Sequence, residues 1–237
     1  MVLDAAGGFV SQRSHPALAL VTTKIVGETL ELALPSGAST RVPLRVDGPR
    51  RPVVVWRSTV DAVEVRGEAA ALFSEHLGAP MTLVCMPDDV VRQVNPLFAT
   101  EGDRVGFADG YPVLFAFAAS HAALVSEMDA PVPMNRFRPN VVVEGGAPWE
   151  EEHHTRLTAG PLHFRTPKRS DRCDVTLVDQ ATAAKGKEPL RTLARLRRSP
   201  EGVLPPNGPN DLCFAMNAIP DAEGRLAVGD PVSLIAG

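Results

Sequence analysis

A cysteine that follows a run of cationic residues is the first feature of this sequence that could do chemistry. Lys168, Arg169 and Arg172 all come shortly before Cys173. Cationic neighbours favour the charged form of a thiol, and a thiolate is a soft ligand that suits a soft or high-valent metal. A single cysteine is more commonly a buried packing residue in a strand. The pattern therefore indicates either metal ligation by Cys173 or a structural thiol.

Two arginines separated by one residue form the second candidate. Residues 135–140 read Asn-Arg-Phe-Arg-Pro-Asn and precede three valines. If this segment is extended, Arg136 and Arg138 share one face and Phe137 points to the other. Two planar guanidinium groups on one face suit an oxyanion, because each offers a fork of donors. A structural pair that binds carboxylates or carbonyls is equally compatible with the pattern.

The other polar and sulfur-containing residues carry weaker signals. His153 and His154 follow three glutamates, but adjacent residues do not share one face of a helix or strand, so we expect a solvated acidic patch there. Cys85 and Cys213 have apolar neighbours and are interpreted as packing residues. The chain contains no P-loop, dinucleotide-binding glycine pattern, Cys-x-x-Cys pair or nucleophile elbow.

Composition narrows the class of protein. The net charge of −4, from 24 basic and 28 acidic residues, does not indicate a nucleic-acid-binding protein. The three cysteines are odd in number and widely spaced, which predicts a reducing cytoplasm rather than a disulfide framework. The most apolar stretch, residues 113–125, is shorter than the roughly 20 residues that span a bilayer. We therefore expect a cytoplasmic protein with no nucleic-acid or membrane partner.

Many short elements must position these candidates. The 22 prolines and 19 glycines are spread along the chain, which favours β structure joined by turns over a helical bundle. Residues 88–109 are polar and are predicted to be a long connection. Strands are expected at residues 18–21, 29–34, 41–46, 82–86, 113–115, 140–143, 162–164 and 173–178. Two short strands are expected within residues 53–65, and two strands joined by a turn within residues 225–235. Helices are expected at residues 68–77, where Gly78 follows as a stop signal, 120–128 and 189–198.

The order of these segments resembles the MOSC family, the molybdenum cofactor sulfurase C-terminal domain, in its amidoxime-reducing branch. Residues 9–13, followed by 16–18, resemble the start of the family's N-terminal barrel. The resemblance implies a mainly β (α+β) fold with few short helices. A MOSC β-barrel at residues 88–237 would follow a smaller β-barrel-like domain at residues 1–87. The other matching pieces are residues 135–140, 149–151, 171–173, 178–180, 188–193 and 228–232.

The resemblance also implies a cofactor and its ligands. Family members bind a molybdenum cofactor (molybdopterin), and their cysteine at the position of Cys173 binds the metal at the catalytic centre. The arginine and asparagine at the positions of Arg138 and Asn140 help to hold the cofactor. By their positions Ser120 and Arg172 are also expected near it. We further expect Arg136, Arg138 and Arg172 to line one anion-binding pocket facing Cys173.

The activity that the resemblance implies is a reduction. The best-studied members reduce N-hydroxylated compounds, such as amidoximes and hydroxylamines, with electrons from a separate redox protein. We therefore expect an oxidoreductase with a small N-hydroxylated substrate and an external electron-donor protein that is ferredoxin-, flavoprotein- or cytochrome b5-like. Two alternatives stay open: a molybdenum cofactor carrier without turnover, and a truncated inactive family member.

The chain departs from the family pattern at three places. The family normally begins with a longer segment that carries Lys, Ser and Arg ligands of the cofactor phosphate, whereas this chain starts within a strand. We therefore expect an open sheet edge near Met1 and weaker cofactor binding, since a charged hydrogen bond contributes about 1.5–3 kcal/mol. In addition, a common Phe-Gly is replaced by Asn207 and Gly208, and a usual Trp by His154.

Overall fold

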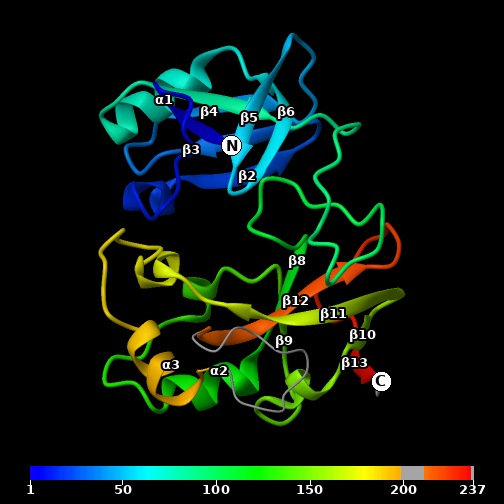
Figure 1. Cartoon of the computed structure of the whole chain (residues 1–237). Helices are drawn as coiled ribbons and strands as arrows, with labels where there is room; N and C mark the ends of the chain where they lie inside the picture. The colour runs from blue at the N-terminus through cyan, green and yellow to red at the C-terminus, as the bar shows by residue number, and fades with distance from the viewer. Residues whose placement is uncertain (199–210, 236–237) are drawn as a thin grey trace. The chain divides into compact units, whose positions relative to one another are not determined.

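The computed structural model describes residues 1–198 and 211–235 of the chain (Figure 1). The departure expected at Asn207 and Gly208 lies outside these described residues. Within them the chain forms thirteen strands, three α-helices and four short 3-10 helices. The prediction of a mainly β protein with few short helices is therefore confirmed.

The chain divides into two compact units, each described here by itself. The first unit comprises Met1–Arg92 together with Val178–Lys185. The second comprises Gln93–Leu177 and Gly186–Gly237. Residues from far along the sequence therefore complete the first unit: Gln180 exchanges hydrogen bonds with the side chain of Gln12 at 3.0 and 3.2 Å.

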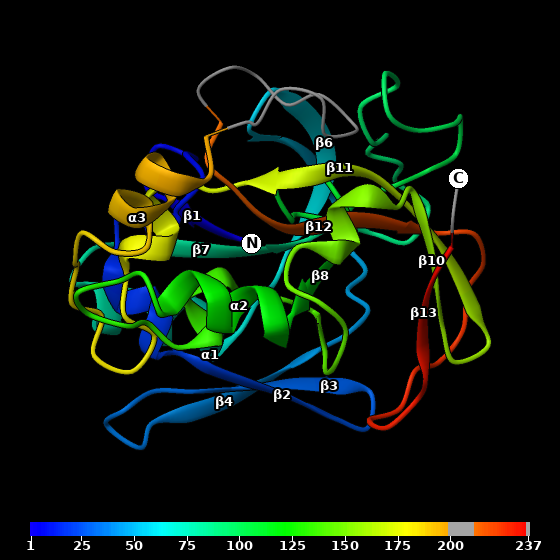
Figure 2. The same cartoon turned by 90° about the horizontal axis from the view of Figure 1, so that it is seen from below.

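The first unit contains two antiparallel sheets. In one, β3 lies between β2 and β4, and Figure 2 shows these three strands as a single layer. The other has four strands in the order β1-β7-β6-β5. Helix α1 contacts both β4 and β7, so its buried face joins the two sheets. The bounds are β1 (Val2–Asp4), η1 (Pro16–Leu20), β2 (Thr22–Val26), β3 (Thr29–Ala33), β4 (Ser39–Pro43), β5 (Arg50–Val55), β6 (Ser58–Glu64), α1 (Glu68–Leu77) and β7 (Met81–Cys85).

Helix α1 has the bounds that its sequence pattern predicts. Its buried side chains Ala69, Leu72 and Phe73 recur at helical spacing, and Gly78 ends it in the left-handed conformation at φ 69° and ψ 20°. The backbone N–H of Gly78 donates to the carbonyl of Ser74. A glycine adopts this conformation without the clash that a Cβ atom would cause.

Gly78→Ala is expected to destabilise the protein by about 1–2 kcal/mol. A Cβ atom at this position would meet nothing within 4 Å, so the loss comes from backbone conformation alone. Urea denaturation followed by circular dichroism measures it. Gly110→Ala is the matched control, because a Cβ there also meets nothing and its φ is not positive. Equal destabilisation by both changes would contradict this account.

Strand β1 has hydrogen-bonding partners on both sides. It pairs with β7 in antiparallel register, Val2 opposite Leu83. On its other side the chain turns back, so that Val10 N donates to Val2 O at 3.0 Å and Asp4 N to Gly8 O at 2.9 Å. The expectation that the backbone groups at this edge lack partners is wrong for these two residues, because the turn that follows β1 supplies them.

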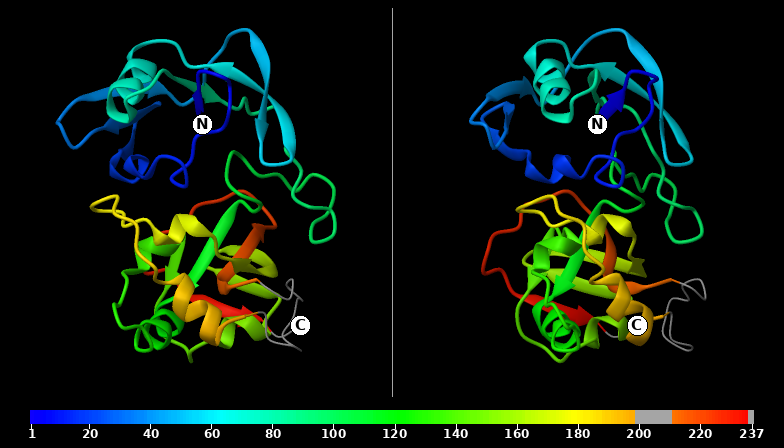
Figure 3. Two further views of the ribbon diagram at one scale, coloured as in Figure 1. Left: turned by 60° about the vertical axis from the view of Figure 1, so that its left-hand side comes forward. Right: turned by 90° about the vertical axis from the view of Figure 1, so that its left-hand side faces the viewer.

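The second unit is built on one six-stranded sheet in the order β13-β10-β11-β12-β8-β9. Strands β8 and β9 are parallel and the other neighbours antiparallel. Figure 3 shows helices α2 (green) and α3 (orange) side by side in both views. The bounds are β8 (Val113–Phe117), α2 (Ala118–Val125), η2 (Met134–Phe137), β9 (Val141–Val143), η3 (Glu150–His153), β10 (Arg156–Ala159), β11 (Leu162–Asp171), η4 (Asp174–Leu177), α3 (Leu190–Leu196), β12 (Cys213–Pro220) and β13 (Val232–Ile235).

Strand β8 separates two apolar cores. Phe115 and Phe117 pack in one core with Leu157 and Phe164, whereas Ala116 packs in the other, against helix α2 and Phe137. This alternation follows from the two-residue period of a strand. Because both faces of the sheet are covered, a middle strand can carry apolar side chains on both of its faces. Strand β12 is an example, and its lack of alternation explains why the sequence pattern did not predict it.

Four local predictions are wrong. The strand expected at residues 18–21 is absent, because Pro16–Leu20 form the 3-10 helix η1. Within the strand expected at residues 173–178, Asp174–Leu177 form the 3-10 helix η4. Residues 225–231 are irregular, so only β13 closes the sheet. Residues 134–137 form η2 rather than an extended segment. The predicted connection at residues 88–109 is confirmed, since it contains no named strand or helix.

Candidate functional site

Cys173 lies in the bend between β11 and η4. Its thiol is free and half-buried. The register of β11 against β12 shifts between Arg169 and Asp171, so the strand ends irregularly and the chain turns. The carbonyl of Cys173 accepts hydrogen bonds from Thr176 N at 3.0 Å and Thr176 Oγ1 at 2.8 Å. These two bonds close the turn that holds the cysteine.

Arg172 ties this turn to the segment around Phe137. Its Nη2 donates to the carbonyl of Phe137 at 2.7 Å, and its Nη1 donates to Ser170 Oγ at 2.6 Å. The guanidinium also lies 5.9 Å from the centre of the Phe137 ring. Its Nε is buried and has no hydrogen-bond partner. A buried N–H without an acceptor is costly in a folded protein, which makes this atom a candidate contact for a ligand.

The charges that affect Arg172 include those of two candidate site residues, Cys173 and Arg138. Burial lowers the pKa of Arg172 below the usual value for arginine, while the negative charges of Cys173, Asp109 and Asp171 raise it. The positive charge of Arg138 lowers it further. Since such effects act over short distances, Cys173 and Arg138 both lie in the electrostatic environment of this one side chain.

The expected alternation of Arg136 and Arg138 on one strand face is wrong. Arg136 lies within η2, where a 3-10 helix places successive side chains about 120° apart rather than on alternate faces, and Arg138 is the residue that ends it. Arg136 is buried, and it donates from Nε to Thr176 O at 2.8 Å and from Nη2 to Glu188 O at 3.1 Å. Arg138 is exposed and left-handed at φ 55° and ψ 46°. Such strained backbone at a non-glycine residue is common at functional sites.

Asn140 and Ser120 bind other parts of the second unit. Asn140 joins β9 to β8, because its N donates to Leu114 O at 2.9 Å and its Oδ1 accepts from Leu114 N at 2.9 Å. Ser120 is fully buried, accepts from Trp149 N at 2.8 Å and donates to Glu151 Oε2 at 2.9 Å. The structure therefore brings Arg136, Arg172 and Cys173 together, while these contacts of Ser120 lie within a separate cluster.

That cluster contains two buried glutamates, which sequence reasoning missed. Glu151 and Glu152 are 1% and 3% exposed, so the prediction of a solvated acidic patch is wrong for them. The carboxylate of Glu152 pairs with Arg197 and lies 3.8 Å from Arg169 Nη1. The partner Arg197 also stacks over the Trp149 ring at 4.0 Å. Because Arg197 is distant in sequence, no local pattern could have identified this pairing.

The environment of Glu151 differs from that of its neighbour. Burial raises the pKa of Glu151 to about 7, against the hydrogen bond from Ser120 and the charge of Arg197, which lower it. The nearby charge of Glu152 raises it further. Its second oxygen, Oε1, is buried without a hydrogen-bond partner. Glu151 is therefore a buried carboxyl group that holds its proton close to neutral pH.

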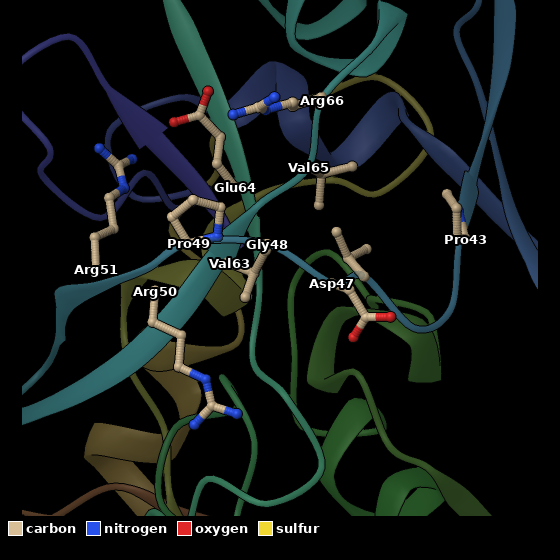
Figure 4. A pocket seen from close by; sticks show the side chains of 11 residues that line it. Pro43, Asp47, Gly48, Pro49, Arg50, Arg51, Val63, Glu64, Val65 and Arg66 are labelled. Carbon is tan, nitrogen blue, oxygen red and sulfur yellow. The ribbon is translucent and has the colours of Figure 1, made fainter.

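A surface hollow of about 400 Å³ lies in the first unit (Figure 4). Its lining carries both signs of charge, since Glu64 and Arg66 both line it, as labelled in Figure 4. Arg50, which also lines it, donates to both carboxylate oxygens of Asp89 at 2.8 Å. None of the predicted site residues lines it. The lining residues are Pro43, Val46, Asp47, Gly48, Pro49, Arg50, Arg51, Val63, Glu64, Val65 and Arg66.

In residues 1–198 and 211–235 there is no group of three or more His, Cys, Asp and Glu side chains that could hold a metal ion. No helix in these ranges has the length and apolar character needed to cross a membrane. The candidate site is the turn at Cys173 together with the turn at Arg138, which the hydrogen bonds of Arg136 and Arg172 join.

Comparison with known proteins gives two family matches and several relatives. Mitochondrial amidoxime-reducing component 1 of Homo sapiens is 28% identical over 246 residues, which cover 99% of this chain and 72% of that protein. Mitochondrial amidoxime reducing component 2 of Bos taurus is 29% identical over 244 residues, covering 98% and 71%. Molybdenum cofactor sulfurase of Drosophila mojavensis is 26% identical over 202 residues, covering 83% of this chain but 25% of that protein.

The family models agree with these relatives. The model of the MOSC N-terminal beta barrel domain matches residues 1–80. The model of the MOSC domain matches residues 102–233, more than half of the chain and the part that contains Cys173. With the fold, the two matches and the relatives in agreement, this chain belongs to the MOSC domain family.

Proposed function

We propose that this chain binds a molybdenum cofactor through Cys173 and reduces small N-hydroxylated compounds. The observation that carries the proposal is the half-buried free thiol of Cys173, held in a turn beside Arg172, whose guanidinium donates to the carbonyl of Phe137 in the turn that carries Arg138. Membership of the MOSC family and relatives named as amidoxime-reducing components and molybdenum cofactor sulfurase support it.

The residues present fit such a cofactor. A thiolate is a soft ligand for molybdenum, so Cys173 would be the metal's protein ligand. Arg138 is exposed and would bind an oxyanion of the cofactor. The buried Nε of Arg172 lacks an acceptor, which an oxygen of the cofactor would supply. The bound group would supply two-electron redox chemistry. The roles of Ser120, Arg136 and Asn140 in holding it remain proposals.

The proposed reaction requires a supply of electrons and protons. Conversion of an N–OH group to N–H breaks the N–O bond, consumes two electrons and two protons, and releases water. A separate redox protein, of ferredoxin, flavoprotein or cytochrome b5 type, would supply the electrons. In this scheme the cationic side chains bind and orient negatively charged groups, and the half-buried position of Cys173 restricts access of water.

Cys173→Ser is expected to abolish molybdenum binding. A serine hydroxyl is a harder and far less acidic ligand than a thiol, so metal content should fall by at least tenfold. Molybdenum is measured by elemental analysis of protein from a host that makes the cofactor. Cys85→Ser is the matched control, since Cys85 is also a free, half-buried thiol. Equal molybdenum in the wild type and Cys173→Ser would exclude Cys173 as the ligand.

Activity separates an enzyme from a carrier. Loaded wild-type protein is supplied with a chemical reductant and benzamidoxime, and formation of benzamidine is measured. Turnover that Cys173→Ser abolishes supports the reductase. Full loading without any turnover would instead favour a protein that carries the cofactor.

A further inference from the structure

Two arginines join the turn that carries Arg138 to the turn that carries Cys173, one donating from each side. Arg136 belongs to η2 and donates from Nε to Thr176 O at 2.8 Å, in the turn that follows Cys173. Arg172 immediately precedes Cys173 and donates from Nη2 to Phe137 O at 2.7 Å, in the turn that carries Arg138. Each turn therefore sends one guanidinium to a backbone carbonyl of the other.

The first of these bonds leads directly to the backbone of Cys173. The carbonyl that Arg136 binds belongs to Thr176, whose own N and Oγ1 donate to Cys173 O at 3.0 and 2.8 Å. Thr176 is 1% exposed. The second donor of Arg136, Nη2, binds Glu188 O at 3.1 Å, so the same side chain also holds the segment that precedes α3.

Burial makes this arrangement rigid. Arg136 is 6% exposed, and the carbonyls that it binds have little access to competing water. A planar guanidinium presents several N–H donors in fixed directions, which lets one side chain hold two carbonyls at once. A lysine keeps the charge but carries a single compact ammonium, and it cannot reproduce both directions.

We infer that Arg136 and Arg172 form a reciprocal clasp that fixes the turn of Cys173 against the turn of Arg138 before any cofactor binds, and that Arg136 is a positioning residue. The inference rests on the proposed function for its purpose, but its geometry concerns this chain's own residues. A site whose groups are held in place binds its ligand at lower entropic cost, so the clasp prepares the turn of Cys173 for a metal.

The clasp has a chemical signature that needs no metal. If the clasp brings the charge of Arg138 close to Cys173, an anionic alkylating reagent should react faster at this thiol, relative to a neutral reagent of similar size, than at a thiol without such a neighbour. The readout is the ratio of the alkylation rates with iodoacetate and iodoacetamide at one pH, measured for each cysteine by peptide mass spectrometry. The full chain is produced in a host that cannot make molybdopterin, so that the thiol is free.

In the wild type this ratio is expected to be roughly fivefold higher at Cys173 than at Cys85, the effect of one unit charge a few ångströms away in water. Arg138→Gln removes one of the cationic charges, since Arg172 stays in place, and should lower the ratio at Cys173 towards that at Cys85. Arg136→Lys keeps Arg138 but opens the clasp, and the ratio at Cys173 should fall at least threefold. General loosening would raise both rates alike and leave the ratio unchanged.

Arg195→Lys is the matched control for Arg136→Lys. Arg195 also donates to a backbone carbonyl, Glu127 O at 2.7 Å, but it does not touch the turn of Cys173. The ratio at Cys173 in Arg195→Lys should equal that in the wild type. If Arg136→Lys does not fold, Thr176→Val removes the bond from Oγ1 to Cys173 O with little change in volume, and the ratio should fall by a smaller factor.

Three results would overturn the inference. The first is a wild-type ratio at Cys173 equal to that at Cys85. The second is an unchanged ratio at Cys173 in Arg136→Lys or, where that variant does not fold, in Thr176→Val. The third is a fall in Arg195→Lys as large as that in Arg136→Lys. Molybdenum content, measured separately in a host that makes the cofactor, tests the proposed function alone. A ratio that depends on Arg136 in a protein that binds no molybdenum would uphold the clasp and reject the proposed function.

Discussion

Glu152→Gln is expected to destabilise the protein by about 3–5 kcal/mol at pH 7, the range for breaking a buried ion pair by removing one partner. Glu152 is 3% exposed and its carboxylate pairs with Arg197, while Arg169, which is fully buried, lies 3.8 Å away. Glutamine keeps the size of the side chain but removes its charge, so both arginines would lose a buried counter-charge.

Urea denaturation measures this loss through tryptophan fluorescence. The chain has two tryptophans, and a Trp56→Phe background leaves Trp149, whose ring lies under Arg197, as the reporter. Glu150→Gln is the matched control in the same run of glutamates. Glu150 is exposed, so its change should stay within about 0.5 kcal/mol. A difference of less than 1 kcal/mol between the two variants would show that the buried pair contributes little.

Glu151→Gln is expected to remove a loss of stability that the wild type shows as the pH rises. The pKa of Glu151 is raised by burial from 4.5 to about 7, so the folded state holds a proton that the unfolded state releases. Stability from this group is fully present below pH 4.5 and is lost as the pH rises towards 7. The loss amounts to about 3 kcal/mol, since one pKa unit corresponds to about 1.4 kcal/mol.

Glutamine cannot ionise, so the variant lacks this loss. Between pH 4.5 and pH 8 the free energy of unfolding of Glu151→Gln, relative to the wild type, should therefore rise by about 3 kcal/mol. The constant cost of placing the amide beside Ser120 cancels in this comparison of two pH values. The measurement is urea denaturation at both pH values, with Glu150→Gln again as control. A parallel pH profile for the wild type and Glu151→Gln would contradict the assignment.

Local signals in the sequence were sufficient for the elements whose ends they mark. The α1 helix has its predicted bounds because apolar spacing, the buried face and a terminal glycine agree at residues 68–78. The mainly β class followed from prolines and glycines spread along the chain. The MOSC family was identified from an ordered set of short segments, and the family models confirm it.

The candidate site could be predicted from sequence only in part. Cys173 was selected from its cationic neighbours, and its place in a half-buried turn is compatible with that choice. The expected strand through Arg136 and Arg138 was wrong, because tight helical turns and strands can share the same short residue pattern. The hydrogen bonds of Arg136 to Thr176 and Glu188 could not be predicted, since they join segments far apart in the sequence.

The sequence by itself determined the fold class, the family and the helix α1, and it predicted Cys173 as the candidate metal ligand. Only the tertiary structure decided which charged residues are buried. Of three consecutive glutamates one is exposed, one pairs with Arg197 and one holds a proton near pH 7. The physical reason is that the ionisation and contacts of a side chain depend on burial and on charges brought close by folding, and neither is encoded in its immediate neighbours.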